Sequence, residues 1–215
     1  MLTPETQRRL PAQQTGANLV GIDFSHVAIS EATALAAERR MSESARFVVS
    51  EARRTEPPSA LFAAVMSIDS LQFMDPGAAT SEIARLLSPG GTAVVTTWEA
   101  LTEVDLPAVV HDYEPFFRDA GLAITKHETL EGARALEQAH YAALLKHAQR
   151  LRVEMRESVE PLLDEAERGL RKAQDPPRVR KVLIVARKTR SDASRPNAER
   201  SSSESPTTTP RKALA

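Results

Sequence analysis

The sequence contains no cysteine among its 215 residues. This absence excludes disulfide frameworks, thiolate zinc sites, iron–sulfur clusters and a cysteine nucleophile. It suits a reducing compartment, and the polar N-terminus shows no apolar signal region, so we expect a cytoplasmic protein. No uncharged apolar run of about 18 residues occurs, so we expect no transmembrane helix.

Aromatic residues and surplus charge are also scarce. Phe, Trp and Tyr make up 4% of the chain, which gives little support for base-stacking platforms or aromatic carbohydrate clefts. The 28 Lys and Arg nearly balance the 29 Asp and Glu, and the formal net charge is -1. Because nucleic acids and acidic membranes are bound through surplus positive charge, we expect neither as a partner. The 41% hydrophobic content is enough for a packed core.

The composition changes near the C-terminus. Residues 189–215 include ten Ser and Thr but a single large aliphatic residue, Leu214. Such a segment cannot offset its ordering entropy, roughly 1–2 kcal/mol per residue, by burying apolar surface. We therefore expect one domain over residues 1–188, followed by a disordered tail over residues 189–215.

Strand-like and helix-like segments alternate along the domain. The apolar runs predict strands at 18–22, 46–50, 61–68, 92–97, 122–128 and 181–187. Helical spacing predicts a helix capped by Ser25, two more at 76–87 and 112–120, and a long helical stretch over 137–172 with a break at Pro161. This alternation predicts an α/β fold with a doubly wound, mostly parallel sheet, closed at one edge by the last two strands.

Two acidic residues follow predicted strands. Asp23 ends the run Leu19–Asp23, and Glu51 follows the second strand. Ligands of open α/β sheets bind at the carboxyl ends of strands, where Asp23 can accept hydrogen bonds from a ribose diol and Glu51 from an exocyclic amine. A helix cap at Asp23 and a solvated loop at Glu51 are the structural alternatives.

Small and polar residues follow the third strand, over residues 67–73. They suit a backbone that approaches a ligand closely, although Asp69 or Ser70 could instead cap the next helix. The later run Pro89-Gly90-Gly91 predicts a tight turn between a helix and the fourth strand.

The order and spacing of segments 21–25, 46–51, 64–73 and 82–91 resemble class I S-adenosylmethionine-dependent methyltransferases of the small-molecule type. The resemblance covers residues 13–188 and implies a Rossmann-like sheet, S-adenosyl-L-methionine as cofactor and methyl transfer to a small-molecule acceptor. The cofactor residues that it implies are Asp23 at the ribose hydroxyls, Phe24 beside the adenine, Glu51 at the adenine amine, Ala52 along the adenine edge and Ser67 near the methionine.

The acceptor is expected after the third and fourth strands, near Asp69, Trp98, His111 and Tyr113. Methyl transfer is an in-line displacement that depends mostly on positioning, with deprotonation of the acceptor in some cases. No residue is assigned as the catalytic base.

One departure from the family stands out. In the methyltransferase family, the first strand ends in a Gly-x-Gly-x-Gly loop, which should fall within residues 1–8 of this sequence. These residues contain no glycine, and Thr3-Pro4 instead predicts the start of a helix. The missing strand should lie between the strand carrying Asp23 and the strand ending at Ser67. We therefore expect these two strands either to pair directly or to leave a marginally stable chain, since each unpaired buried backbone group costs about 1–3 kcal/mol.

Two explanations of this departure stay open, a start codon assigned too late and a real loss of the strand. The second explanation leads to an alternative function, a non-catalytic methyltransferase-like remnant or binding protein that has lost its cofactor.

Other chemistries have weaker support. Glu137, His140 and His147 lie near one predicted helix face, but a metal site needs three or four converging ligands, so we expect no metal. A nicotinamide oxidoreductase would need a glycine fingerprint, and the pair Tyr141 and Lys146 is spaced one residue too widely for a Tyr-x-x-x-Lys motif.

Overall fold

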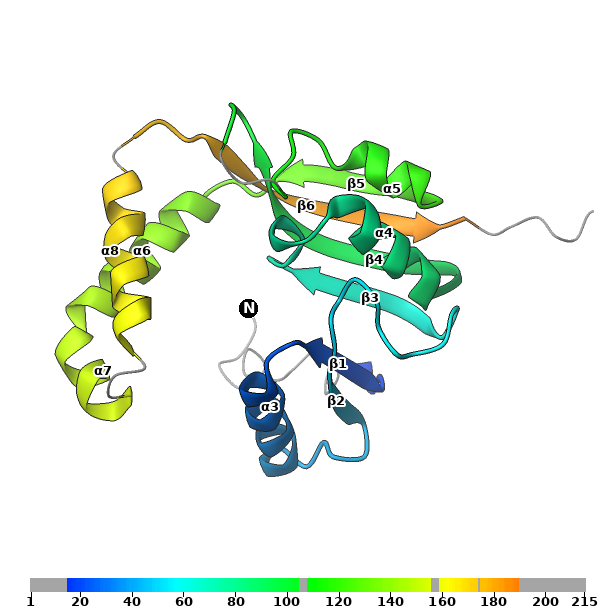
Figure 1. The fold of residues 1–215 in the computed structure, drawn as a ribbon, viewed down its shortest axis with the longest axis horizontal. Helices are drawn as coiled ribbons and strands as arrows, with labels where there is room; N and C mark the ends of the chain where they lie inside the picture. The colour runs from blue at the N-terminus through cyan, green and yellow to red at the C-terminus, as the bar shows by residue number, and fades with distance from the viewer. Residues whose placement is uncertain (1–14, 105–107, 156–158, 174, 190–215) are drawn as a thin grey trace, which may run out of the picture.

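The computed structural model describes residues 15–104, 108–155, 159–173 and 175–189 (Figure 1). The predicted helix start at Thr3-Pro4 and residues 190–215 of the predicted tail lie outside these ranges. The elements in chain order are β1 (Leu19–Asp23), α3 (His26–Glu38), β2 (Ala45–Val49), β3 (Phe62–Ile68), the short 3-10 helix η1 (Leu71–Phe73), α4 (Pro76–Leu86), β4 (Leu87–Ala100), α5 (Glu114–Asp119), β5 (Leu122–Thr129), α6 (Ala133–Lys146), α7 (Ala148–Met155), α8 (Glu160–Lys172) and β6 (Val179–Lys188).

The strands form two sheets. Strands β1 and β2 pair in parallel as one sheet, and the other has the order β3-β4-β6-β5. Strand β3 is parallel to β4, whereas β6 runs antiparallel to both of its neighbours. The α/β class, the mostly parallel strands and the closure of one edge by the last two strands are thereby confirmed.

The two strands expected to flank the missing strand, β1 and β3, belong to different sheets. Among the described residues no backbone pairing joins β1 to β3, although the two strands run in the same direction (Figure 1). Direct pairing, one of the two expected outcomes, therefore does not occur. Large apolar side chains on the neighbouring elements are exposed, namely Leu19, Val27, Met66, Ile68 and Phe73. The strands of the described ranges thus form two separate sheets.

The loop between β2 and β3 is fastened to α4. The Glu82 carboxylate accepts hydrogen bonds from the Thr55 amide and hydroxyl, both at 2.7 Å. The Arg85 guanidinium binds the same carboxylate at 2.7 Å and donates to the carbonyls of Thr55 and Pro57. The hydrogen bond from Arg85 is the main cause that lowers the pKa of Glu82 from 4.5 to about 2. The Glu82–Arg85 pair therefore connects the loop after β2, a strand of the smaller sheet, to α4 beside the larger sheet.

The start of α3 follows the sequence prediction. Ser25 is the N-cap, and its hydroxyl accepts the Ala28 amide at 3.2 Å. The neighbouring strand β1 needs a glycine, because a Cβ atom on Gly21 would come within 2.5 Å of the Phe47 ring on β2.

Strand β4 lies inside the larger sheet and is longer than the predicted 92–97. Its pairing with β6 extends to Ala100, and its pairing with β3 shifts register between Phe62 and Ala64. Gly90 has a positive φ of 78° at this shift, so the chain bends at the predicted turn although the strand continues through it. The core behind β4 is made by η1, α4, α5 and the strands, with Leu71, Leu87, Tyr113, Phe117, Leu122 and Ile184 fully buried or nearly so.

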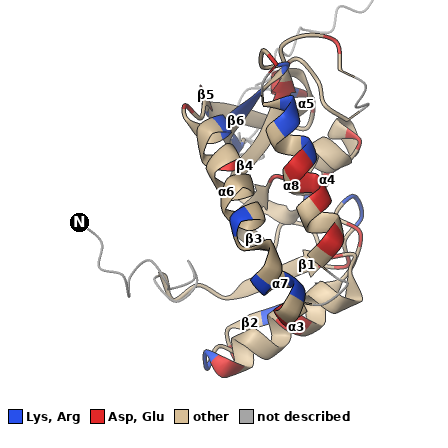
Figure 2. Ribbon diagram, turned by 90° about the vertical axis from the view of Figure 1, so that its left-hand side faces the viewer, with Lys and Arg blue, Asp and Glu red and all other residues tan. Residues whose placement is uncertain are grey.

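The long helical stretch before β6 is divided into α6, α7 and α8, and α6 packs on α8. Pro161 lies in the first turn of α8, where a proline is tolerated, so the predicted break is confirmed. Acidic residues precede basic ones along α8, the order that suits the helix dipole (Figure 2). A Cβ atom on Gly169 would overlap the Tyr141 ring, so glycine allows α6 and α8 to meet here. None of the described helices is long and apolar enough to cross a membrane.

Candidate functional site

The carboxyl ends of β1 and β3 face the same side of the molecule, and the helices α6 and α8 stand beside that side (Figure 1). Parallel strands bring the residues that follow them to one edge of a sheet. The fold therefore places Asp23 at the last position of β1 with Phe24 directly after it, Glu51 and Ala52 after β2, and Ser67 next to the last residue of β3, along this edge.

Asp23 and Phe24 are open to a ligand. The Oδ1 atom of Asp23 accepts the Ser25 amide at 2.8 Å, and the side chain is exposed. Because Ser25 caps α3, Asp23 is not needed as the cap, and the structure does not favour that alternative. Phe24 is 80% exposed, so its ring is accessible to a ligand.

Glu51 and Ala52 are also exposed. The Oε2 atom of Glu51 contacts the Arg53 guanidinium at 3.0 Å, an exposed pair of small energetic value. Glu51 can exchange this contact for a ligand donor at little cost.

The end of β3 is held in an unusual conformation. Asp69 has a positive φ of 52°, a left-handed backbone that is uncommon for residues other than glycine. Its carboxylate accepts the Thr96 hydroxyl at 3.0 Å and the Lys181 ammonium at 2.6 Å. Ser67 and Ser70 share a hydrogen bond of 2.7 Å between their hydroxyls. Such strain is typical of functional sites, because surrounding contacts must maintain it.

Lys181 joins Asp69 to the aromatic residue Trp98. Its ammonium lies 5.5 Å from the centroid of the Trp98 ring, within range of a cation–π contact. Trp98 in turn lines a cavity of about 610 Å³ between β4, the start of β6 and the helices α6 and α8. Tyr141, Arg168 and Lys172 line the helical side of this cavity.

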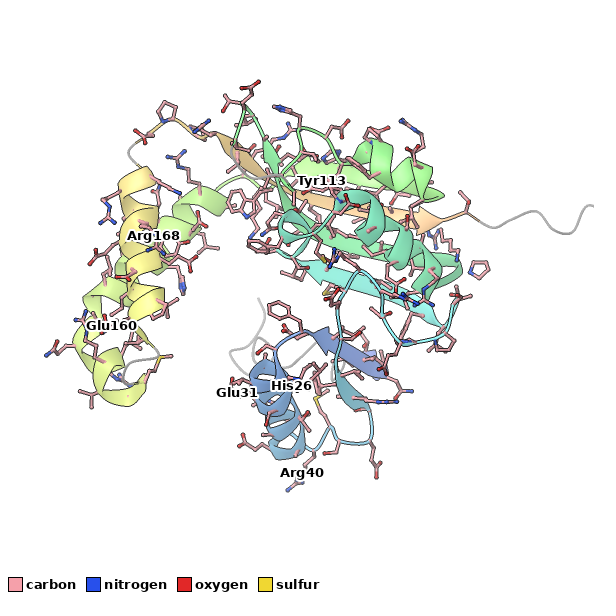
Figure 3. The ribbon with its side chains drawn as sticks, viewed as in Figure 1. His26, Glu31, Arg40, Tyr113, Glu160 and Arg168 are labelled. Carbon is pink, nitrogen blue, oxygen red and sulfur yellow. The ribbon has the colours of Figure 1, made fainter. Side chains whose placement is uncertain are left out.

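The Tyr141 hydroxyl lies 3.5 Å from Glu137 and 3.3 Å from Glu165. Burial and these two carboxylates raise the pKa of Tyr141 to about 12, so the phenol stays neutral at physiological pH. Arg168 lies on α8, across the cavity from the sheet (Figure 3).

His111 and Tyr113 do not line this cavity. The Nδ1 atom of His111 lies 2.9 Å from the Ala100 carbonyl. Tyr113 is fully buried in the core, where its hydroxyl donates to the Ala108 carbonyl at 2.9 Å, and burial raises the pKa of its phenol. Lys181 brings Asp69 and Trp98 together, whereas acceptor contacts at His111 and Tyr113 have no support from their positions.

Sequence reasoning missed Lys181 and Tyr141. Lys181 lies in an apolar strand far along the chain from Asp69, so no spacing rule connects the two. For Tyr141 the sequence offered only an ill-fitting Tyr-x-x-x-Lys spacing and a place in the predicted helical stretch 137–172.

The exposed groups along the edge fit the adenosine half of S-adenosylmethionine. They offer a carboxylate for the ribose, an open aromatic ring for the adenine and a second carboxylate for its amine. The methionine half lacks the usual cradle of amides, because the sequence contains no Gly-x-Gly-x-Gly run.

The first part of the chain is similar to known methyltransferases. The profile of a family described as methyltransferase domain matches residues 6–95, which include β1 to β3 and the first part of β4. A rice protein (Oryza sativa subsp. japonica) named probable tocopherol O-methyltransferase, chloroplastic, is 35% identical over 91 residues. That match covers 42% of this chain and 25% of the rice protein, so the chain spans about a quarter of this curated relative.

Solved structures show the same fold. The [4+2]-cyclase SpnF superposes with a TM-score of 0.70 at 23% identity, covering 83% of this chain and 68% of its own. Geranyl diphosphate C-methyltransferase from Streptomyces coelicolor A3(2) gives a TM-score of 0.62 at 16% identity, covering 83% and 65% respectively. That structure is a complex with Mg²⁺, geranyl diphosphate and S-adenosyl-L-homocysteine. These structures confirm the Rossmann-like fold class, and the methyltransferase profile agrees with the family resemblance over residues 6–95.

Proposed function

We propose that the protein transfers a methyl group from S-adenosyl-L-methionine to a small-molecule acceptor. The observation that carries the proposal is the open edge where Asp23, Phe24 and Glu51 follow parallel strands, beside a cavity lined by Trp98. The methyltransferase profile supports it, because residues 6–95 contain this edge.

The proposed cofactor contacts follow from side-chain chemistry. Asp23 accepts hydrogen bonds from the ribose hydroxyls, Phe24 covers one face of the adenine, and Glu51 accepts from the adenine amine. Ala52 lies along the adenine edge without crowding it, and Ser67 lies near the methionine. When bound, the cofactor supplies an electrophilic methyl group on a sulfonium.

The acceptor is proposed to lie in the cavity between the strand ends and α6 and α8. Trp98 offers an apolar wall, Tyr141 a neutral hydrogen-bonding group, and Arg168 a cation. Asp69 is already held by Thr96 and Lys181, so it fixes the shape of the strand end and acts through positioning. These residues exclude water and orient the acceptor, which are the main requirements of a displacement at carbon.

A second candidate function is a methyltransferase-like protein that binds no cofactor. The observation in its favour is the unpaired edge of β1 facing β3 among the described residues, where the family has a strand. A cytoplasmic location stays a prediction from the composition.

A transfer assay tests the proposal. The purified chain is incubated with S-adenosylmethionine labelled on its methyl group and a panel of small amines, alcohols, phenols and carbanion-forming lipids. We expect label in one class of acceptor, with loss of transfer in Asp23→Ala and in Trp98→Ala but not in Glu131→Ala, a change at an exposed turn residue. A folded chain that neither transfers label nor binds S-adenosylhomocysteine would overturn the proposal and favour the second candidate.

A further inference from the structure

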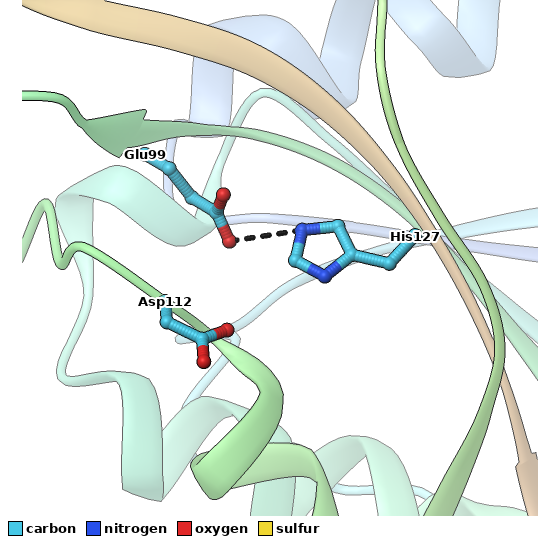
Figure 4. Close-up of side chains that lie close together, drawn as sticks. All are labelled: Glu99, Asp112 and His127. Carbon is cyan, nitrogen blue, oxygen red and sulfur yellow. Dashed lines mark ion pairs between the residues drawn. The ribbon is translucent and has the colours of Figure 1, made fainter.

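A cluster of three potential metal ligands lies outside the proposed methyl-transfer site. Glu99 near the end of β4, Asp112 before α5 and His127 on β5 each offer one ligand atom, and these atoms lie within 4.8 Å of one another (Figure 4). Side chains alternate between the two faces of a strand, so Glu99 lies on the face of β4 opposite to Trp98. The cluster is therefore separated by the sheet from the acceptor cavity.

The histidine in this cluster lacks a hydrogen bond. Its Nε2 atom is buried and lies 3.0 Å from Oε1 of Glu99, but the geometry is not that of a hydrogen bond (Figure 4). The contact with Glu99 is an ion pair when the imidazole is protonated, but it leaves the buried Nε2 atom without a hydrogen bond, a feature that calls for an explanation. Two ligands of one tetrahedral zinc ion, each at about 2.1 Å, are about 3.4 Å apart, so a small shift from the 3.0 Å separation seen here would let both atoms bind one ion.

Neighbouring groups fix the orientation of the two carboxylates. Glu99 is fully buried, and its Oε2 atom accepts hydrogen bonds from Nε and Nη2 of Arg180 at 3.0 and 2.8 Å. Its Oε1 atom accepts the Tyr113 amide at 3.2 Å. The Oδ1 atom of Asp112 accepts the Glu114 amide at 2.8 Å. Outer partners of this kind hold metal ligands in place.

The charges of the cluster favour a cation. Glu99 is paired with the Arg180 guanidinium and Asp112 adds a second carboxylate, so these three groups and a neutral imidazole together carry one net negative charge. One nitrogen and two oxygen ligands suit a borderline divalent ion such as zinc, with water completing its coordination.

We propose that Glu99, Asp112 and His127 bind a divalent transition-metal ion that links β4, the segment before α5 and β5. The three segments are distant in sequence and meet only through folding. The ion therefore stabilises the folded state by mass action and takes no part in methyl transfer. The proposal is independent of the proposed enzymatic function.

Zinc titration tests the proposal. The full chain is freed of metal with a chelator and titrated with zinc by calorimetry, in parallel with melting curves. We expect one zinc per chain and a higher melting temperature with zinc. Affinity should fall at least tenfold in His127→Ala and in Asp112→Asn but stay unchanged in His140→Ala, a matched histidine on α6.

Asp112 is exposed, so Asp112→Asn should fold normally. It therefore tests the proposal even where His127→Ala fails to fold. Zinc binding that is equal in wild type and Asp112→Asn, or an unchanged melting temperature with zinc, would overturn the proposal. The contact between Glu99 and His127 would then be a simple ion pair. Both readouts are independent of methyl transfer.

Discussion

The Glu82–Arg85 pair predicts a large change of stability at acidic pH. Glu82 is 8% exposed, and Arg85 holds its carboxyl at a pKa of about 2, against 4.5 in an unstructured chain. The difference of about 2.5 pH units, at 1.36 kcal/mol per unit, corresponds to about 3 kcal/mol of unfolding free energy. A lowered native pKa stabilises the fold above the unfolded value, so this contribution is complete above pH 4.5 and is lost as the pH falls toward 2.

The test is urea unfolding of wild type and Glu82→Gln between pH 3 and pH 7. Glutamine keeps an oxygen that can accept the Thr55 amide but loses the charge that faces Arg85. We expect the variant to be less stable by about 2–3 kcal/mol at pH 7, and the two proteins to converge as the pH falls. The matched control is Glu56→Gln, which removes an exposed carboxylate from the same loop.

A constant difference between wild type and Glu82→Gln over the whole pH range would refute the reasoning, because the contribution would then not depend on ionisation. A Glu56→Gln variant with the same pH dependence as Glu82→Gln would refute it as well.

Three further substitutions test the packing of the fold by denaturant unfolding. Gly169→Ala should lower stability by about 1–3 kcal/mol, because the new methyl group meets the Tyr141 ring, and Tyr141→Ala in the same chain should remove most of that additional cost. Glu99→Ala should cost about 2–4 kcal/mol, since it leaves Arg180 without its buried partner; a loss below 0.5 kcal/mol would contradict this role. Ser25→Ala should cost about 1 kcal/mol through loss of the α3 cap, and no change would contradict the cap.

Much of the fold could be predicted because residues close in the sequence determine where its strands and helices begin and end. The apolar run before Asp23 gave β1, Ser25 gave the start of α3, and Pro161 gave the break before α8. Each depends on residues close in the sequence. The end of β4 was predicted too early, because its last residues are held by pairing with β6, a contact between distant segments.

The candidate site was only partly predictable. Asp23 and Glu51 could be found because each follows an apolar run at the edge where parallel strands end. Tyr113 was expected at the acceptor, but an aromatic side chain after a strand can equally turn into the core, and here it does. The cluster around Glu99 and the link between Asp69 and Lys181 depend on strand register, which the sequence alone does not provide.

The central claim is that the edge around Asp23 binds the adenosine part of S-adenosylmethionine. The direct measurement is the thermal unfolding of the full chain with S-adenosylhomocysteine, for wild type, Asp23→Ala and the control Asp119→Ala on exposed α5 surface. At about 100 times its dissociation constant the ligand should stabilise wild type and the control by about 2.7 kcal/mol, or several degrees, and Asp23→Ala much less. A cooperative transition of wild type that does not move with the ligand, or an equal shift in Asp23→Ala, would contradict the claim.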